Sequence, residues 1–186
     1  MPEKETALPE LGLLADLLRV RNATEVAITR IIGRPAQIGH IGEYIASRIF
    51  RIELEGSAVH PGADGRFIDG PLAGKSVNVK MYGKLEGALD IREEYLPDYY
   101  LVLTGARATE ITSKGITRPW VIELVFLFEA HSLVERLRER GVKLGPATSV
   151  VSAEWEAGRV YPVSDTAPLL ITKDQEHLLQ LFGTAP

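Results

Sequence analysis

Asp64, Asn78 and Lys80 are the residues of this chain whose types and spacing could carry out phosphoryl chemistry. Asp64 stands in the glycine-containing segment 62–65, which is typical of a turn, and residues 76–81 alternate polar and apolar side chains. That alternation predicts a half-buried strand, on which residues two apart point to the same side. Asn78 and Lys80 are therefore expected on one face, with Val79 pointing into a core. An acid, an amide oxygen and a lysine gathered across a hairpin could form a metal-dependent phosphodiesterase site.

Magnesium is the cofactor that this set of groups predicts, with manganese as a substitute, because Mg²⁺ prefers oxygen ligands and keeps several waters. Asp64 and the amide oxygen of Asn78 are expected to bind it. The backbone carbonyl of Val79 and the carboxylate of Glu43, on a helix just upstream, would add further oxygens. Lys80 would orient the attacking water or offset charge on the phosphate. Asn78 is the weak point, since a neutral ligand holds a divalent cation less strongly than a carboxylate. Glu43 can also be interpreted as a solvated helix glutamate.

Helices are predicted before this segment. Apolar residues at helical spacing indicate a helix over residues 8–21, and the capping-box spacing of residues 22–25 indicates a second helix that ends at Gly33. A third helix is predicted over residues 37–50, with Ile41 and Ile45 in its buried stripe.

Strands and two further helices are predicted after Glu43. Short strands are expected at 51–55 and 66–68, and the site strand is expected at 76–81. Segment 84–96 is ambiguous and is interpreted as a loop with one helical turn. Near-continuous apolar runs at 99–104 and 120–128 predict strands covered on both faces. A capping-box spacing at residues 132–135 opens a helix that ends at Gly141, and a last helix is expected from about 172 to 182. We expect one buried sheet face, made of Val77, Val79, Leu101, Leu103, Leu124 and Phe126.

This order of elements resembles the PD-(D/E)xK nuclease superfamily, the restriction-endonuclease-like fold, over about residues 37–141. The resemblance implies an α/β fold with a central mixed sheet flanked by helices. Residues 1–36 would then be an N-terminal helical extension, and residues 142–186 a C-terminal strand and helix of the same domain. Carried over by position, Glu43 matches the helix acid, Asp64 the first motif acid and Lys80 the motif lysine. Asn78 stands where the superfamily has a second acid.

Pro97-Asp98 has the motif's letters, but no acid-x-Lys strand follows it, and we interpret the pair as a chance match. The chain also resembles small uncharacterised bacterial proteins, a second resemblance that implies no activity. Glu123 and His60 are two other residues whose side chains could take part in a site. A carboxylate at Glu123 is expected to be paired in the core, because a lone buried charge would be costly. His60 is interpreted as a loop residue.

Composition limits the function further. The formal net charge of -4 argues against a dedicated nucleic-acid binder with a basic surface, although local contact with DNA or RNA stays open. The chain has no cysteine, which excludes disulfides and thiolate metal sites. No apolar run reaches the length of a membrane span and the N-terminus is charged, so a cytoplasmic protein is expected.

Three interpretations remain open at this point. The first is a magnesium-dependent nuclease acting on DNA or RNA. The second is a catalytically inactive module on the same fold, binding nucleic acid or a protein partner. The third is an unrelated α/β domain. The sequence predicts no oligomeric state.

Overall fold

The structure is a computed structural model that describes residues 3–56, 62–107 and 119–184, with side chains from residue 9 onward. The chain divides into two compact units, residues 1–41 and residues 42–186. The candidate site lies in the second unit. His60, interpreted as a loop residue, falls outside the described residues.

The first unit is built on one continuous helix, α1 (Glu3–Ile32). The predicted break at residues 22–25 is wrong, and the side chains there explain why. Thr24 donates its hydroxyl proton to the Val20 carbonyl one turn back at 2.9 Å, and Arg21 pairs with Glu25 at 2.8 Å. Both are contacts between residues four apart on a helix. The residues that would cap a new helix therefore act inside an existing one.

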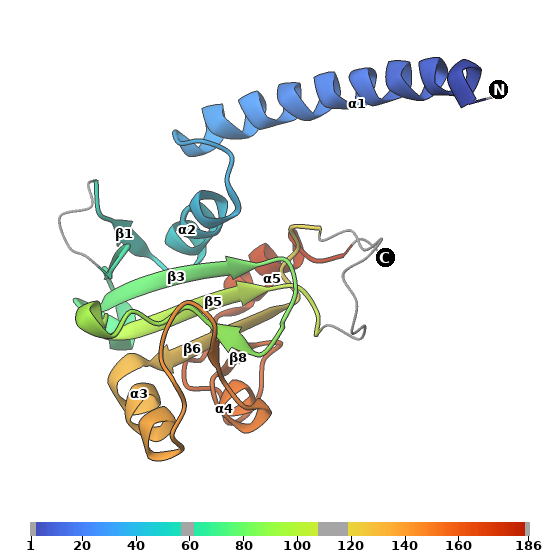
Figure 1. Ribbon diagram of the computed structural model, residues 1–186. Helices are drawn as coiled ribbons and strands as arrows, with labels where there is room; N and C mark the ends of the chain where they lie inside the picture. The colour runs from blue at the N-terminus through green and yellow to red at the C-terminus, as the bar shows by residue number, and fades with distance from the viewer. Residues whose placement is uncertain (1–2, 57–61, 108–118, 185–186) are drawn as a thin grey trace. The chain divides into compact units, whose positions relative to one another are not determined.

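A mixed six-stranded sheet forms the centre of the second unit (Figure 1). Its strand order is β1-β2-β3-β5-β6-β8, with β3 and β5 parallel and the other neighbours antiparallel. The strands are β1 (Ile52–Leu54), β2 (Gly65–Phe67), β3 (Ser76–Tyr82), β5 (Tyr99–Thr104), β6 (Leu124–Glu129) and β8 (Arg159–Tyr161). The strands that carry the site and the core were thus predicted in order and within a few residues. The exception is β6, which begins four residues later than its apolar run suggested.

Helices cover the two faces of this sheet. Helix α2 (Ile38–Ile49) follows the predicted range, and its residues from Gly42 onward belong to the second unit. A Cβ placed on Gly42 would lie 2.6 Å from Met81 Cβ, so helix and strand are in close contact there. Helix α5 (Lys173–Gln180) packs next to the end of α2, with Gln175 Nε2 donating to the Ile49 carbonyl at 2.7 Å. Helices α3 (Ala130–Glu139) and α4 (Ser152–Ala157) cover the opposite face (Figure 1).

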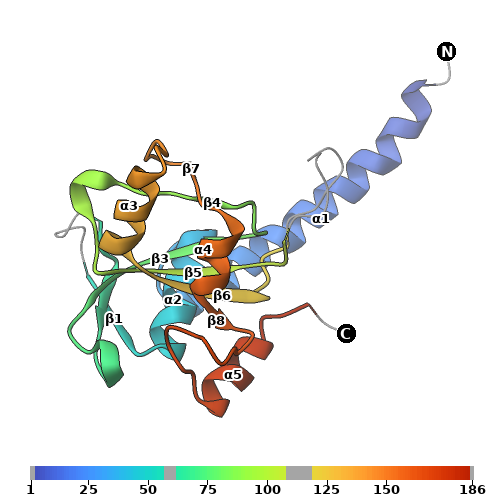
Figure 2. The same ribbon diagram turned by 90° about the horizontal axis from the view of Figure 1, so that it is seen from below.

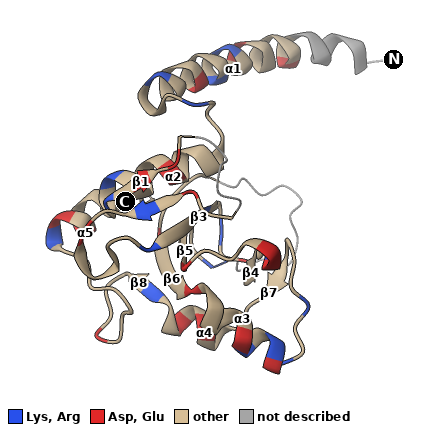
Figure 3. Ribbon diagram, turned by 90° about the vertical axis from the view of Figure 1, so that its left-hand side faces the viewer, with Lys and Arg blue, Asp and Glu red and all other residues tan. Residues whose placement is uncertain are grey.

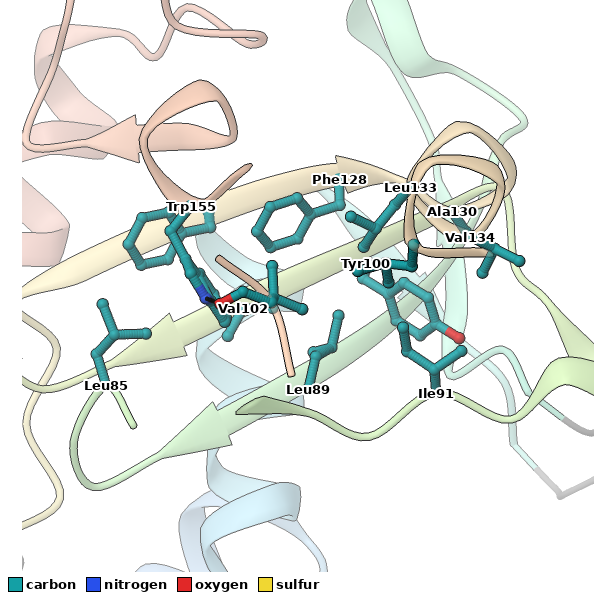
Figure 4. Packing of buried hydrophobic residues seen from close by; sticks show 13 residues of the cluster. Leu85, Leu89, Ile91, Tyr100, Val102, Phe128, Ala130, Leu133, Val134 and Trp155 are labelled. Carbon is teal, nitrogen blue, oxygen red and sulfur yellow. Dashed lines mark hydrogen bonds between the residues drawn. The ribbon is translucent and has the colours of Figure 1, made fainter. Parts of the chain in front are cut away.

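The core on the α3 and α4 side is aromatic. Trp155 of α4 lies edge-on to Phe126 and Phe128 of β6, at centroid distances of 4.8 and 5.1 Å (Figure 4). Its indole N–H donates to the Val150 carbonyl at 3.1 Å, so the buried donor is satisfied. The prediction of one buried sheet face is wrong for β6, because the strand register sets Phe126 and Leu124 on the same face as Lys80, opposite to the predicted residues of β3 and β5. Leu124, at the start of β6, is also only partly buried. The others are at most 5 % exposed, namely Val77, Val79, Leu101, Leu103 and Phe126.

A two-stranded sheet lies beside this core, and one of its strands falls in segment 84–96, which was interpreted as a loop with one helical turn. Strand β4 (Ala88–Leu89) pairs antiparallel with β7 (Thr148–Ser149) (Figure 2). Short 3-10 turns follow β2 at Gly70–Leu72 and β4 at Glu93–Tyr95. Leu89 is fully buried, which explains why so short a strand is held in place.

The helix starts agree with prediction at one helix and differ at another. Helix α5 begins near Thr172 as predicted, and Thr172 and Gln175 form a capping box there. Helix α3 starts two residues earlier than expected, because its cap is the Glu129 carboxylate, which accepts a hydrogen bond from the Ser132 amide at 2.7 Å. None of the helices within the described ranges is both long and apolar enough to cross a membrane.

Candidate functional site

Three of the predicted site residues line a single cavity. Its volume is about 220 Å³, and its wall comes from the end of the 62–65 turn, from β3, from β5 and from the segment after β4. The lining residues are Gly62, Asp64, Asn78, Lys80, Asp90, Arg92 and Tyr100. The strand periodicity therefore correctly predicted that Asp64, Asn78 and Lys80 converge.

Asp64 is held in place by the edge of β3. Its amide donates to the Val77 carbonyl at 2.8 Å, and its carboxylate Oδ2 accepts from the Val79 amide at 2.7 Å. The turn before it needs a glycine, since Gly62 has φ +91° and a Cβ there would lie 2.0 Å from the Tyr95 carbonyl oxygen. The N–H and C=O of one strand residue point to the same side. The Val79 carbonyl therefore lies on the Asp64 side of β3, where it was predicted to act as a ligand.

Lys80 and Asp90 form an ion pair inside the cavity. Lys80 Nζ lies 3.0 Å from Asp90 Oδ2, and the two side chains are only 21 % and 29 % exposed. Partial burial weakens solvent screening, so this pair is stronger than a surface salt bridge. Lys80 is thus held with its positive charge at the wall of the cavity.

Asn78 carries an unsatisfied oxygen. Among the described residues, its Oδ1 atom is buried and has no hydrogen-bond partner. A buried polar atom without a partner costs free energy, and such an atom in a native fold calls for a bound donor or cation. Asn78 lines the same cavity as Asp64 and Asp90.

Two tyrosines border Asp90. The Asp90 amide lies 3.3 Å from the Tyr82 hydroxyl oxygen, to which it donates. Burial, together with the nearby Asp90 carboxylate, raises the pKa of Tyr100 to about 12. Burial likewise raises the pKa of Tyr82. Both phenols therefore stay protonated at neutral pH, and Tyr100 in the cavity wall can serve as a hydrogen-bond donor.

Glu43 is not brought to this cavity. Met81 follows Lys80 on β3 and so points to the other face of the sheet. Gly42, the neighbour of Glu43, lies against Met81. The helix that carries Glu43 thus covers the face opposite to Asn78 and Lys80, and Glu43 is not among the lining residues.

The donor set fits a hard cation with few protein ligands. The cavity offers the Asp64 and Asp90 carboxylates and the orphaned Asn78 oxygen, with the Val79 carbonyl at its edge. Mg²⁺ is commonly bound through one or two carboxylates, with water and substrate oxygens completing the shell. Within the part of the chain that the structure describes, no group of three or more His, Cys, Asp or Glu side chains is placed to hold a metal. The set therefore suits a cation shared with a substrate better than a closed structural site.

Sequence reasoning missed Asp90, Arg92 and Tyr100. A signal for the first two was present, because Leu89, Asp90, Ile91 and Arg92 alternate apolar and charged residues. Leu89 and Ile91 are buried at 0 % and 1 %, so the period of two describes this segment well. The signal was hidden because only Ala88–Leu89 of this segment forms a regular strand. Tyr100 gave no such signal, since it lies in a continuous apolar run.

Two other acids have structural partners. Asp98 ties the start of β5 to β3, accepting from the Ser76 amide at 2.8 Å and the Ser76 hydroxyl at 2.7 Å. This agrees with its interpretation as a chance motif match. Glu123 is paired, as expected, but at a partly exposed position just before β6, where it accepts from the amide of Thr184 at 2.8 Å. Hydrogen bonds from the Thr184 hydroxyl and amide lower the pKa of Glu123.

Comparisons with protein-family models and with curated proteins found no match to this chain.

Proposed function

We propose that this protein is a metal-dependent nuclease with a restriction-endonuclease-like core, in which Asp64 and Asp90 are the two carboxylates. The order of helix, turn, hairpin, site strand and two core strands supports the fold part of the proposal. The observation that carries the chemistry is the buried, unsatisfied Asn78 oxygen in a cavity with two acids and a lysine. A bound divalent cation would satisfy that oxygen.

The chain's own residues supply the remaining parts of a phosphodiester hydrolysis. A bound Mg²⁺ would polarise the phosphate and lower the pKa of a bound water. Asp64 is oriented by the Val79 amide, so its carboxylate is preorganised before any ligand arrives. Lys80 is positioned to offset negative charge that develops on the phosphate. Arg92, exposed at the cavity, can bind a non-bridging phosphate oxygen, and Tyr100 can donate a hydrogen bond.

In this proposal, Asp90 supplies the second carboxylate that Asn78 does not provide. The second acid expected at position 78 is absent, but Asp90 reaches the same cavity from the segment after β4. Its ion pair with Lys80 orients both side chains in the resting protein. A cation entering the cavity would share the Asp90 carboxylate with Lys80, leaving the ammonium group closer to an incoming phosphate.

The test is cleavage of plasmid, single-stranded DNA and RNA in Mg²⁺ and in Mn²⁺, with calorimetric titration of both metals. We expect Asp90→Asn to weaken metal binding, and Lys80→Ala to lower the cleavage rate about 10²–10³-fold while metal still binds. Asp69→Asn is the matched control, because Asp69 is a surface acid paired with Arg51 and does not line the cavity. Absence of cleavage with either metal, and with Asn78→Asp as well, would reject the nuclease.

A catalytically inactive module that binds nucleic acid or a protein is the second candidate. The neutral residue at position 78 and the net charge of -4 favour it. It predicts salt-dependent retention of nucleic acid without cleavage, and retention that Lys80→Ala or Arg92→Ala reduces. If the protein retains neither DNA nor RNA, binding to a protein partner is the alternative that remains.

A further inference from the structure

Helix α1 carries a large apolar surface that its own unit leaves uncovered. Eight of its apolar side chains are between 44 % and 67 % exposed, namely Leu11, Leu13, Leu14, Leu17, Leu18, Val20, Val26 and Ile31. Contiguous exposed apolar surface of this kind marks an interaction site. A 30-residue helix is about 45 Å long at 1.5 Å per residue, long enough for several turns of helix pairing.

A heptad spacing, called here the seam, runs along α1, and Leu14 and Leu18 are its members among the eight exposed apolar residues. Positions 14, 18, 21, 25, 28 and 32 are separated by four, three, four, three and four residues, which is the spacing of core positions in a coiled coil. The residues are Leu14, Leu18, Arg21, Glu25, Ile28 and Ile32. The spacing is the same read from either end. The two charged residues occupy its middle, and apolar residues occupy both ends.

We propose that α1 pairs antiparallel with α1 of a second copy of this chain, around a two-fold axis that passes near residue 23. A parallel, in-register pair would set Arg21 against Arg21 of the partner subunit, and would likewise oppose the two copies of Glu25. Both contacts are repulsive. The antiparallel pair instead sets Arg21 against Glu25 of the partner subunit, twice by symmetry.

The apolar ends of the seam also match in this orientation. Leu14 meets Ile32 of the partner subunit, and Leu18 meets Ile28 of the partner subunit. In the single chain Arg21 pairs with Glu25 within the helix at 2.8 Å, with the side chains 68 % and 41 % exposed. Pairing of two copies would give each of these charges a second opposite neighbour. Because the centre of the seam is charged, the seam is poorly suited to insert into lipid and well suited to pair with the seam of a second copy. This inference does not depend on the proposed function.

Sedimentation velocity of the full chain over a range of concentrations tests the pairing. The wild type is expected to be a dimer. Arg21→Glu should weaken dimerisation at least about tenfold, because it replaces two attractive contacts by two repulsive ones. Glu25→Arg should do the same. The double variant R21E/E25R should restore the dimer, and an equimolar mixture of the two single variants should form a heterodimer.

The matched control is Arg19→Glu. Arg19 pairs with Asp16 on the polar side of α1, away from the seam, so the same charge change should leave the dimer intact. Circular dichroism checks that each variant stays helical. The orientation of the two helices can be determined by cross-linking single introduced cysteines, because the described chain has none of its own. A short bismaleimide should cross-link a mixture of Leu18→Cys and Ile28→Cys variants, and should not cross-link either variant to itself.

Three results would overturn the proposal. The first is a wild type that stays monomeric at about 100 μM, well above the micromolar range of specific dimers. The second is an Arg21→Glu variant that dimerises like the wild type, and the third is a Leu18→Cys variant that cross-links to itself. Binding of a monomer to vesicles of anionic lipid would assign the apolar surface to a membrane interface instead.

Discussion

Asn78 is the residue on which the candidate chemistry depends most directly. A carboxylate at this position would stand beside Asp64 and Asp90 in a cavity of about 220 Å³. Without a cation, three negative charges so close together repel one another. With a cation, each added carboxylate strengthens binding. If the cavity binds a cation as proposed, the neutral amide lowers the affinity for that cation and avoids charge repulsion when the cation is absent.

Asn78→Asp should strengthen metal binding and destabilise the metal-free protein. In EDTA we expect the variant to be less stable than the wild type by about 1–2 kcal/mol, from like-charge repulsion. In saturating Mn²⁺ a tenfold gain in affinity would add about 1.4 kcal/mol of stabilisation. Thermal unfolding with and without Mn²⁺ measures both. Asn78→Ala is the control, and a manganese effect on it equal to that on the aspartate variant would contradict the assignment.

Asp98 should make the stability of the fold depend on pH. Burial alone would raise the pKa of this carboxyl, but hydrogen bonds from Ser76 and Lys75 outweigh burial and lower it. A lowered pKa in the folded state means that the ionised form stabilises the fold. The contribution is complete above the pKa of the unfolded chain, about 3.9 for Asp, and is lost as pH falls through the lower folded value.

Urea unfolding of wild type and Asp98→Asn measures this contribution. At pH 7 the wild type should be more stable, by about 1–3 kcal/mol for the loss of hydrogen bonds to a charged group. The difference should shrink as the pH falls below about 4, close to the ordinary Asp pKa. A difference that stays constant from pH 7 to pH 3 would mean that the Asp98 charge plays no part.

For single residues, the prediction from sequence was correct where strand periodicity alone determines the direction in which a side chain points. Asn78 and Lys80 share a face because they are two apart on a strand. Asp64 joins them because a hairpin returns to that strand. Glu43 could not be placed in the same way, since its position depends on which face of the sheet its helix covers. That choice is made by the close contact of Gly42 with Met81, a tertiary contact with no local signature.

At the scale of an element, the packing of the buried face of helix α2 can be tested at Ile45. Ile45 is 6 % exposed and lies on the helix face that carries the other buried residues of α2. Ile45→Ala should destabilise the protein by about 2–5 kcal/mol in chemical denaturation, from lost burial and the cavity left behind. Arg48→Ala, an exposed change on the same helix, is the control. A loss near zero at Ile45 would show that this face is not packed.

Gly42 should resist substitution even though alanine favours helices. Gly42→Ala gains about 1 kcal/mol of helix propensity. Its new Cβ, however, would lie 2.6 Å from Met81 Cβ, closer than carbon atoms approach without a shift of the backbone. We expect net destabilisation of about 1–3 kcal/mol from this overpacking. Unfolding in urea measures it, and a more stable variant would mean that helix and strand separate easily.

Elements were predictable where one local signal dominated. Strand β5 was predicted at its observed bounds because its apolar run is bounded by turn residues on both sides. The start of β6 was misplaced because Trp120 and Ile122 continue the apolar pattern, while strand pairing with β5 begins only at Leu124. The break in α1 was wrong because the residues of a capping box also make contacts within a helix.

At the scale of the whole molecule, charge bears on how nucleic acid would be held. Acidic and basic residues are interspersed along the described ribbon (Figure 3), and the net charge is -4. The cavity itself has two cations, Lys80 and Arg92. Any binding of duplex DNA through it should therefore engage few phosphates.

The salt dependence of binding should be correspondingly shallow. Two phosphate contacts predict a slope of log K against log salt of about -2 for duplex DNA. Fluorescence anisotropy between 50 and 200 mM KCl, roughly the range in which such slopes are measured, gives the value. Arg92→Ala should reduce the magnitude of the slope by about 1. A slope near -6, on the order of a basic-surface binder, would mean that another surface holds the nucleic acid.

Two backbone amides beside the β4–β7 pairing can show by their hydrogen exchange whether the cavity is occupied. The Ile91 amide donates to the Gly145 carbonyl at 3.0 Å, and the Val150 amide donates to Gly87 at 2.9 Å. These bonds flank Asp90 and break only when this short ladder opens. A cation or phosphate that contacts Asp90 would hold the ladder closed, and hydrogen–deuterium exchange at both amides would slow. Isotope uptake at these amides would then report occupancy of the cavity even for a variant that cleaves nothing.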